Sequence, residues 1–230
     1  MSEITDSQGK RFKPLKKDQI GKYDKAAQDA NNELTRLTVR TLLHTGLRNG
    51  TLCHLQPGWI ENERILGKPM IRVPPRERCL SGAGATGVGN EEGANLHDRG
   101  EPCYNCRIEY GGHWEPKTRN APRPLPVMEE EIHSSLKRWL ESHEQIPLLH
   151  HAVATRVQRV AEQAGLDREV KPHDLRHTYG TMLARMGLKL PVIAAVMGHG
   201  STNQSMRYIT FVGRDIMEEF KENWDFDEYL

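Results

Sequence analysis

Apolar residues recur at helical spacing through the second half of the chain. Three stripes of this kind place their apolar side chains on one face of a helix, over residues 132–140, 153–161 and 175–183. A shorter apolar run over residues 191–197 stops at Gly198, a residue typical of helix ends. Polar residues suited to cap a helix follow, just before a stretch that contains Tyr208. The pattern predicts a helical C-terminal half.

The first half combines one helical pattern with segments typical of strands. Leu34, Leu37 and Leu42 have helical spacing, and Gly46 supplies a stop signal. Residues 70–73 predict a strand that ends at two prolines, and residues 114–127 predict a hairpin. We therefore expect a mainly α fold with a small antiparallel β-sheet, in the α+β class.

Composition divides the chain into unequal parts. Residues 1–25 are polar and lysine-rich, which predicts a basic arm or linker. Residues 26–212 carry the periodic patterns and predict one domain, interrupted by a Gly- and Cys-rich insertion at about 76–113. The segment 213–230 mixes acidic and apolar residues and predicts an amphipathic C-terminal tail.

Net charge does not by itself indicate a partner. The 230 residues include 32 Lys and Arg against 31 Asp and Glu, a formal charge of +1, whereas nucleic-acid binders are usually more basic. The charge is unevenly distributed, however, because the acidic C-terminal segment offsets a basic remainder of the chain in the net count. The sequence contains no apolar run long enough to cross a bilayer and no signal peptide, so we expect a cytoplasmic protein with no membrane partner.

A histidine and an arginine fall three residues apart at a predicted helix start. Pro172 favours the first turn of a helix, and His173 and Arg176 then share one face near its positive end. This arrangement suits a phosphate group, but two surface residues with no joint role would look the same. His173 and His177 also have the spacing of a metal-binding pair, which leaves a metal-dependent hydrolase as an alternative.

The wider context makes the phosphate interpretation specific. Arg48 lies in HTGLRNG, Lys117 in PKTRNAPRPLPV, His199 in MGHGS, and Tyr208 nine residues further on. With these motifs and HDLRHTYGTML, the chain resembles the tyrosine recombinase (phage integrase) family over roughly residues 30–212. The resemblance implies six catalytic residues: Arg48, Lys117, His173, Arg176, His199 and Tyr208.

The resemblance implies a site-specific DNA recombinase that cuts and rejoins DNA with no metal or ATP in the reaction. Tyr208 would attack phosphorus and form a 3′-phosphotyrosine, while Arg48 and Arg176 bind the phosphate oxygens. Lys117 would protonate the departing 5′-oxygen, and the two histidines would orient or donate to the phosphate. The implied partners are a double-stranded DNA attachment site and further copies of the chain, as a dimer to tetramer on DNA. The final helix would dock on a neighbouring copy or on its own domain.

Two features depart from the family pattern. Thr51 stands where the family usually has an acidic residue, three positions after the first arginine. Only about thirty residues precede the region of resemblance, which leaves no room for the usual core-binding domain, so we expect either a fragment or a minimal recombinase. Two other activities remain open: a type IB topoisomerase-like enzyme that relaxes DNA, and a catalytically weak relative that only binds it.

The insertion holds a CxxC motif that indicates a candidate zinc site. Cys103 and Cys106 form the motif, and Cys79 and His97 lie in the same segment as further candidate ligands, with His113 as an alternative to His97. A structural zinc would supply folding energy to a segment poor in apolar residues. Reduced cysteines with no metal would give the same sequence. Cys53 is expected in the core. Cysteine-bearing insertions at this place resemble those of some archaeal integrases.

Overall fold

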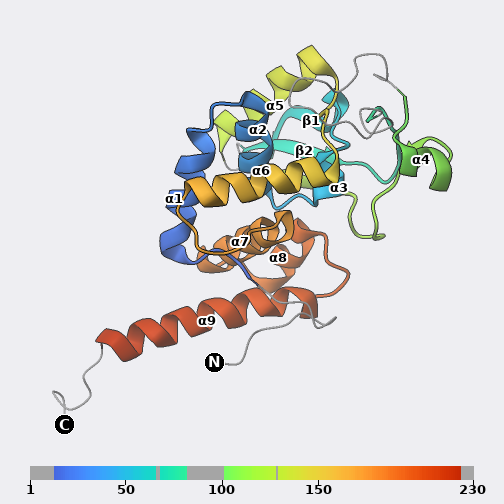
Figure 1. Ribbon diagram of the computed structural model, residues 1–230. Helices are drawn as coiled ribbons and strands as arrows, with labels where there is room; N and C mark the ends of the chain where they lie inside the picture. Colours follow the sequence, from blue (N-terminus) through green and yellow to red (C-terminus); the bar gives the residue numbers. More distant parts are fainter. Residues whose placement is uncertain (1–12, 66–67, 82–100, 128, 224–230) are drawn as a thin grey trace, which may run out of the picture.

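The computed structural model describes residues 13–65, 68–81, 101–127 and 129–223; for 62–65, 68, 214–215 and 218–223 it describes the backbone alone. Helices dominate (Figure 1), which confirms the predicted fold class. They are α1 (Lys17–Gln28), α2 (Glu33–Thr45), α3 (Asn49–Leu52), α4 (Tyr104–Glu109), α5 (Glu130–His143), α6 (His150–Gln163), α7 (Pro172–Arg185), α8 (Leu190–Met197) and α9 (Asn203–Asn223). No helix in these ranges is long and apolar enough to span a membrane.

Two small antiparallel sheets accompany the helices. The first has the strand order β1 (Ile60–Ile65), β2 (Lys68–Val73) and β5 (Arg123–Pro126); the second pairs β3 (Glu77–Arg78) with β4 (His113–Trp114). The hairpin expected over residues 114–127 is therefore wrong. β4 returns to β3 and β5 continues the first sheet next to β2, because the insertion supplies β4 with its own partner strand.

The main core is formed by α1, α2, α5, α6 and the first sheet. Leu42, Leu136 and Val157, on α2, α5 and α6, are fully buried in it. A smaller apolar cluster joins α7, α8 and the first half of α9, and it includes Tyr179, Ile193 and Tyr208. Figure 1 shows α9 as a long helix that extends past α7 and α8.

The predicted arm is wrong over residues 17–25. These residues form most of α1, which packs on α2 and α6 and buries Tyr23 completely. The Tyr23 hydroxyl donates a hydrogen bond to the Val157 carbonyl, 3.0 Å away. Ile20, Tyr23 and Ala27 form a short apolar face with helical spacing, which is difficult to recognise in the sequence among so many lysines.

Helix ends lie close to their predicted places because the stop signals are local. Gly46 and Gly198 follow α2 and α8 with φ of +61° each, in the left-handed region that glycine adopts without strain. Pro172 opens α7. The predicted boundary at residue 212 is absent, since α9 runs without a break from Asn203 to Asn223 and joins the tail to the helix of Tyr208.

Candidate active site

Arg176 lies at the centre of the candidate site. Its guanidinium is buried and donates hydrogen bonds to the carbonyl oxygens of Gly46 and Met197, which are the residues at the ends of α2 and α8. Burial, together with repulsion from Arg48, lowers the pKa of Arg176 to about 9. The side chain therefore fixes two helix ends and brings positive charge into the interior.

Arg48 lies beside Arg176 and has one guanidinium nitrogen that donates no hydrogen bond to the described residues. It precedes α3, and its Nη2 donates to the Gly198 carbonyl at 3.4 Å. Its Nη1 is buried and has no hydrogen-bond partner among the residues that the structure describes. Burial lowers the pKa of Arg48, while the nearby Tyr208 acts in the opposite direction. A buried guanidinium nitrogen without a partner is costly unless a ligand satisfies it.

A third arginine, Arg123, lies close enough to Arg48 and Arg176 to repel both. Its Nε donates to the Val196 carbonyl at 2.6 Å and its Nη1 to the Ala121 carbonyl at 2.8 Å, which joins β5 to α8. Burial lowers its pKa to about 10, with a further contribution from Arg48. Sequence analysis did not select Arg123, although it lies in the same motif as Lys117. Three buried or half-buried cations so close together favour an anion between them.

Tyr208 is buried on α9, with 1% of its surface exposed. Its ring lies against Gly180 of α7, where an added Cβ would come within 2.5 Å of a ring carbon. Burial raises the pKa of the phenol above its usual value, and Arg176, Arg207 and Arg48 oppose that shift. Cations near the hydroxyl would stabilise a phenolate once it forms.

The histidines are arranged differently from the sequence expectation. His173 is exposed on the first turn of α7, and its ring contacts that of His177 at 4.2 Å between centroids. His177 in turn places Nδ1 3.5 Å from the Tyr208 hydroxyl, a long hydrogen bond. In the sequence His177 was predicted only as half of a metal pair, and its contact with Tyr208 was missed. The spacing of four residues, which places His177 on the same helix face as His173, was the sequence feature that could have indicated a place in the site.

His199 flanks the tyrosine from the other side. Its ring stacks near Tyr208, with centroids 5.9 Å apart, and its Nδ1 lies 2.7 Å from the Ser205 hydroxyl. Burial lowers its pKa to about 3, helped by Arg176 and Arg207. The ring is therefore neutral at pH 7, so one of its two nitrogens carries a hydrogen and can donate it.

Comparison with known proteins finds a family match in the C-terminal half of the chain. Residues 116–211 match the model of the phage integrase family. Residues 116–211 are a phage integrase domain. The chain is also 32% identical over 73 residues to a tyrosine recombinase XerD of Corynebacterium glutamicum, an alignment that spans 32% of this chain and 24% of that protein. An integrase/recombinase of Escherichia coli is 36% identical over 50 residues, 22% of this chain and 15% of that protein. The matched relatives are thus far longer than the aligned segments.

Solved structures share the fold beyond the integrase domain. The XerA recombinase superposes with a TM-score of 0.58 at 18% identity, over 92% of this chain and 65% of that one. The XerH recombinase bound to its difH substrate gives 0.58 at 18% identity, over 89% and 56%. The catalytic domain of bacteriophage HP1 integrase gives 0.51 at 15% identity, over 93% and 96%. The N-terminal elements that carry Arg48 therefore belong to the same fold.

Lys117 stands apart from the residues gathered around Arg176. It is exposed in the connection between β4 and β5, at the start of the integrase domain. Its charge acts on His150, whose pKa is lowered first by burial and then by His54 and Lys117. The lysine thus lies on the side of the molecule that faces α6 and the insertion, while the other five predicted residues lie on or next to α3, α7, α8 and α9.

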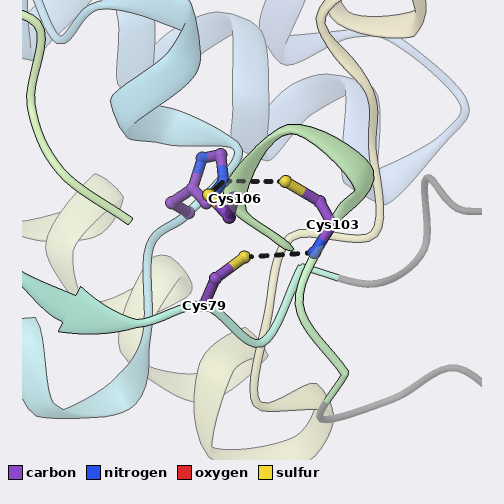
Figure 2. Close-up of side chains that lie close together, drawn as sticks. Cys79, Cys103 and Cys106 are labelled. Atoms are coloured by element: carbon purple, nitrogen blue, oxygen red, sulfur yellow. Dashed lines mark hydrogen bonds between the residues drawn. The ribbon is translucent and has the colours of Figure 1, made fainter. Parts of the chain in front are cut away.

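The cysteines of the insertion come together just outside the integrase domain. Cys79, Cys103 and Cys106 converge as Figure 2 shows, and the fourth member of the group is His54. The alternative fourth ligand, His113, is wrong: the pairing of β4 with β3 turns its ring toward Arg76 and the Gly111 carbonyl. His97 lies outside the described residues.

His54 was missed because it lies outside the insertion. It follows Cys53 directly after α3, 25 residues before Cys79, and sequence separation gave no reason to join it to the CxxC motif. Cys53 is in the core, as expected. The His173–His177 pair has no third ligand in the part of the chain that the structure describes, so the alternative of a metal hydrolase finds no support there.

Proposed function

We propose that this chain is a site-specific DNA recombinase that cleaves and rejoins DNA through a covalent 3′-phosphotyrosine at Tyr208. The single observation that carries the proposal is the buried, unpartnered Nη1 of Arg48, next to Arg176 and within the electrostatic field of Tyr208. A phosphodiester bound there would satisfy the guanidinium and lie beside the nucleophile.

In the proposed reaction, Arg48 and Arg176 hold the non-bridging oxygens of the scissile phosphate. The Tyr208 oxygen forms a bond to phosphorus, its proton passes to a base, and the bond from phosphorus to the 5′-oxygen breaks. His177 is placed to accept the phenolic proton, since its Nδ1 faces the hydroxyl and its low pKa keeps it neutral. Reversal of the same steps with a new 5′-hydroxyl rejoins the strands, and the phosphotyrosine conserves the energy of the original bond.

The remaining residues complete the proposal. His199 donates from Nε2 to a phosphate oxygen if the Ser205 hydroxyl donates to its Nδ1. His173 supports His177 by ring contact. Lys117, on an exposed connection, is proposed as the acid that protonates the 5′-oxygen once the connection lies against DNA. Any metal held by the Cys–His group is structural in this proposal, because four protein ligands leave no open position.

We propose double-stranded DNA as the partner and a homo-oligomer as the form that acts on it, in the cytoplasm. Support for DNA comes from relatives solved with DNA, among them XerH bound to difH. Support for an oligomer comes from α9, whose Phe211 and Val212 pack on the smaller core while Ile216 and Met217 are 48% and 59% exposed. Comparing the size in solution of the full chain and of a chain ending at Val212, both on DNA, tests the second proposal.

The test of function is a covalent trap. A pool of nicked duplexes with randomised half-sites is incubated with the protein, and adducts that survive denaturing detergent are collected. The adduct must disappear in Tyr208→Phe and persist in Tyr179→Phe, which alters a second buried tyrosine of the same core. An adduct that persists in Tyr208→Phe, or none from any duplex, would overturn the proposal.

Relaxation of supercoiled DNA separates the two covalent activities. A recombinase exchanges strands between two copies of its captured site, whereas a type IB topoisomerase-like enzyme relaxes plasmids that lack the site. Exchange with little relaxation is the expected result. The reverse result would assign the chain to the second activity.

A further inference from the structure

We propose that His54, Cys79, Cys103 and Cys106 bind one zinc ion, which fastens the insertion to the short helix that follows Arg48. The four ligand atoms all lie within 4.8 Å of one another. His54 Nε2 is 3.5 Å from the Sγ atoms of both Cys103 and Cys106. With Zn–S and Zn–N bonds of about 2.3 and 2.0 Å, a tetrahedral site has N–S edges of about 3.5 Å. The distances from His54 to Cys103 and Cys106 thus already equal the edges of a zinc site, and all four ligand atoms are close enough to share one ion.

The imidazole of His54 is oriented for metal binding. Its Nδ1 lies 2.6 Å from the Gly50 carbonyl, to which it can donate a hydrogen bond. A hydrogen on Nδ1 leaves the lone pair of Nε2 free, and Nε2 is the atom that faces the cysteines. A backbone carbonyl that fixes the second nitrogen in this way is a regular partner of zinc-bound histidine. The ring also stacks on Trp114, with centroids 5.8 Å apart.

The Cys79 sulfur is surrounded by donors suited to a thiolate. The backbone N–H groups of Ser81 and Cys103 both donate to Cys79 Sγ at 3.4 Å, and Figure 2 shows the second of these bonds. Zinc binds cysteine as the thiolate, and these two N–H groups are placed to donate to that sulfur while it faces the other three ligands.

The backbone around the CxxC motif forms a tight knuckle. Cys103 precedes α4, Cys106 lies in its first turn, and the Gly112 N–H donates to the Cys106 carbonyl at 2.9 Å. Gly111 and Gly112 have positive φ of +58° and +87°, which lets the chain reverse directly after the helix. The reversed chain accepts a bond from the Cys79 N–H at the Gly112 carbonyl. Both halves of the cluster are therefore held together by the backbone as well.

The ion would connect the insertion to two parts of the active site. Gly50, which accepts from His54, lies in α3, and α3 begins directly after Arg48. Trp114, which stacks on His54, lies three residues before Lys117. Zinc on His54 would therefore limit the movement of the segment that positions Arg48 and of the connection that carries Lys117. With four protein ligands its role would be structural, which agrees with the small apolar content of the insertion.

Metal analysis of the full chain tests the site without DNA. The purified wild-type protein should contain one zinc per chain, and cobalt(II) in its place should give the intense visible absorption of a tetrahedral thiolate site. His54→Ala and Cys106→Ala should lower zinc affinity by at least about tenfold. The matched controls Cys53→Ala and His113→Ala should keep the metal. His54→Cys should also keep it, with a shifted cobalt spectrum, and so guards against loss by misfolding.

Hydrogen exchange tests the connection to Arg48. Removal of zinc with a chelator should speed amide exchange in residues 48–54 and 103–112, with little change in α5. A wild-type protein without stoichiometric metal, or a Cys106→Ala variant that keeps it, would overturn the site. Unchanged exchange in residues 48–54 would overturn the connection. These measurements do not test the recombinase proposal. A protein that binds zinc but forms no DNA adduct would contradict only the recombinase proposal, and a protein that forms the adduct without zinc would contradict only the zinc site.

Discussion

The ring of Tyr208 lies directly on the backbone of Gly180, so that a Cβ at position 180 would be 2.5 Å from the ring carbon Cζ. This contact is backbone against aromatic ring, and neither partner can move without shifting α7 or α9. Gly180 is thus the residue that allows the Tyr208 ring to approach the helix of Arg176.

Gly180→Ala should displace Tyr208 and sharply reduce adduct formation. Overpacking of this kind costs about 1–3 kcal/mol of folding free energy, so the protein should remain folded but less stable. Gly213→Ala is the matched control, since a Cβ there meets nothing within 4 Å, and it should stabilise α9 by about 0.5–1 kcal/mol. Thermal unfolding and adduct yield measure the two effects. Full adduct yield from Gly180→Ala would contradict the packing argument.

Arg48→Lys should separate catalysis from stability. A lysine keeps the charge but not the fork that binds a phosphate through two nitrogens, so cleavage should fall by about 10²–10³-fold. The free energy of unfolding should change little, because the hydrogen bond that is lost, from Arg48 Nη2 to the Gly198 carbonyl, is long at 3.4 Å. Single-turnover cleavage and urea unfolding provide the measurements. Arg138→Lys, on an exposed face of α5, should change neither.

The histidines beside Tyr208 should make the fold sensitive to acid. Burial lowers the pKa of His177 to about 2 and that of His199 to about 3, from an ordinary 6.5. Between these values the unfolded chain binds protons that the folded chain does not. Stability is therefore complete above pH 6.5 and decreases as the pH falls below it. Each histidine contributes a slope of up to about 1.4 kcal/mol per pH unit.

His177→Gln should lower the slope of unfolding free energy against pH, because the variant lacks the proton that His177 takes up only on unfolding. Urea unfolding of wild type and variant at several pH values between 7.5 and 5 gives the difference in slope, which cancels the contributions of other groups. Equal slopes would show that His177 titrates normally in the folded protein.

Arg123→Lys should loosen the junction of β5 and α8. The guanidinium donates to the carbonyls of Val196 and Ala121 together, and an ammonium cannot reach both with the same geometry. An unsatisfied buried carbonyl costs about 1–3 kcal/mol, which thermal unfolding can detect. Because the junction precedes His199, cleavage should slow as well. Arg119→Lys, exposed in the same motif, is the control for stability.

Sequence reasoning succeeded where structure depends on neighbours along the chain. The stops at Gly46 and Gly198 and the start at Pro172 are local, and the helices end or begin there. It failed for α1, where lysines outnumber the apolar residues that the helix buries, and for the hairpin at residues 114–127, where strand partners come from distant segments.

Short-range patterns are enough to predict the helical class of the protein, the motifs that contain Arg48, Arg176, His199 and Tyr208, and the CxxC motif. These follow from residue type and short-range spacing. Three contacts depend on how the chain folds: His177 with Tyr208, Arg123 with the other site arginines, and His54 with the cysteines. Each of these contacts joins segments separated by dozens of residues or, for His177, depends on how two helices pack. Sequence spacing therefore cannot specify them.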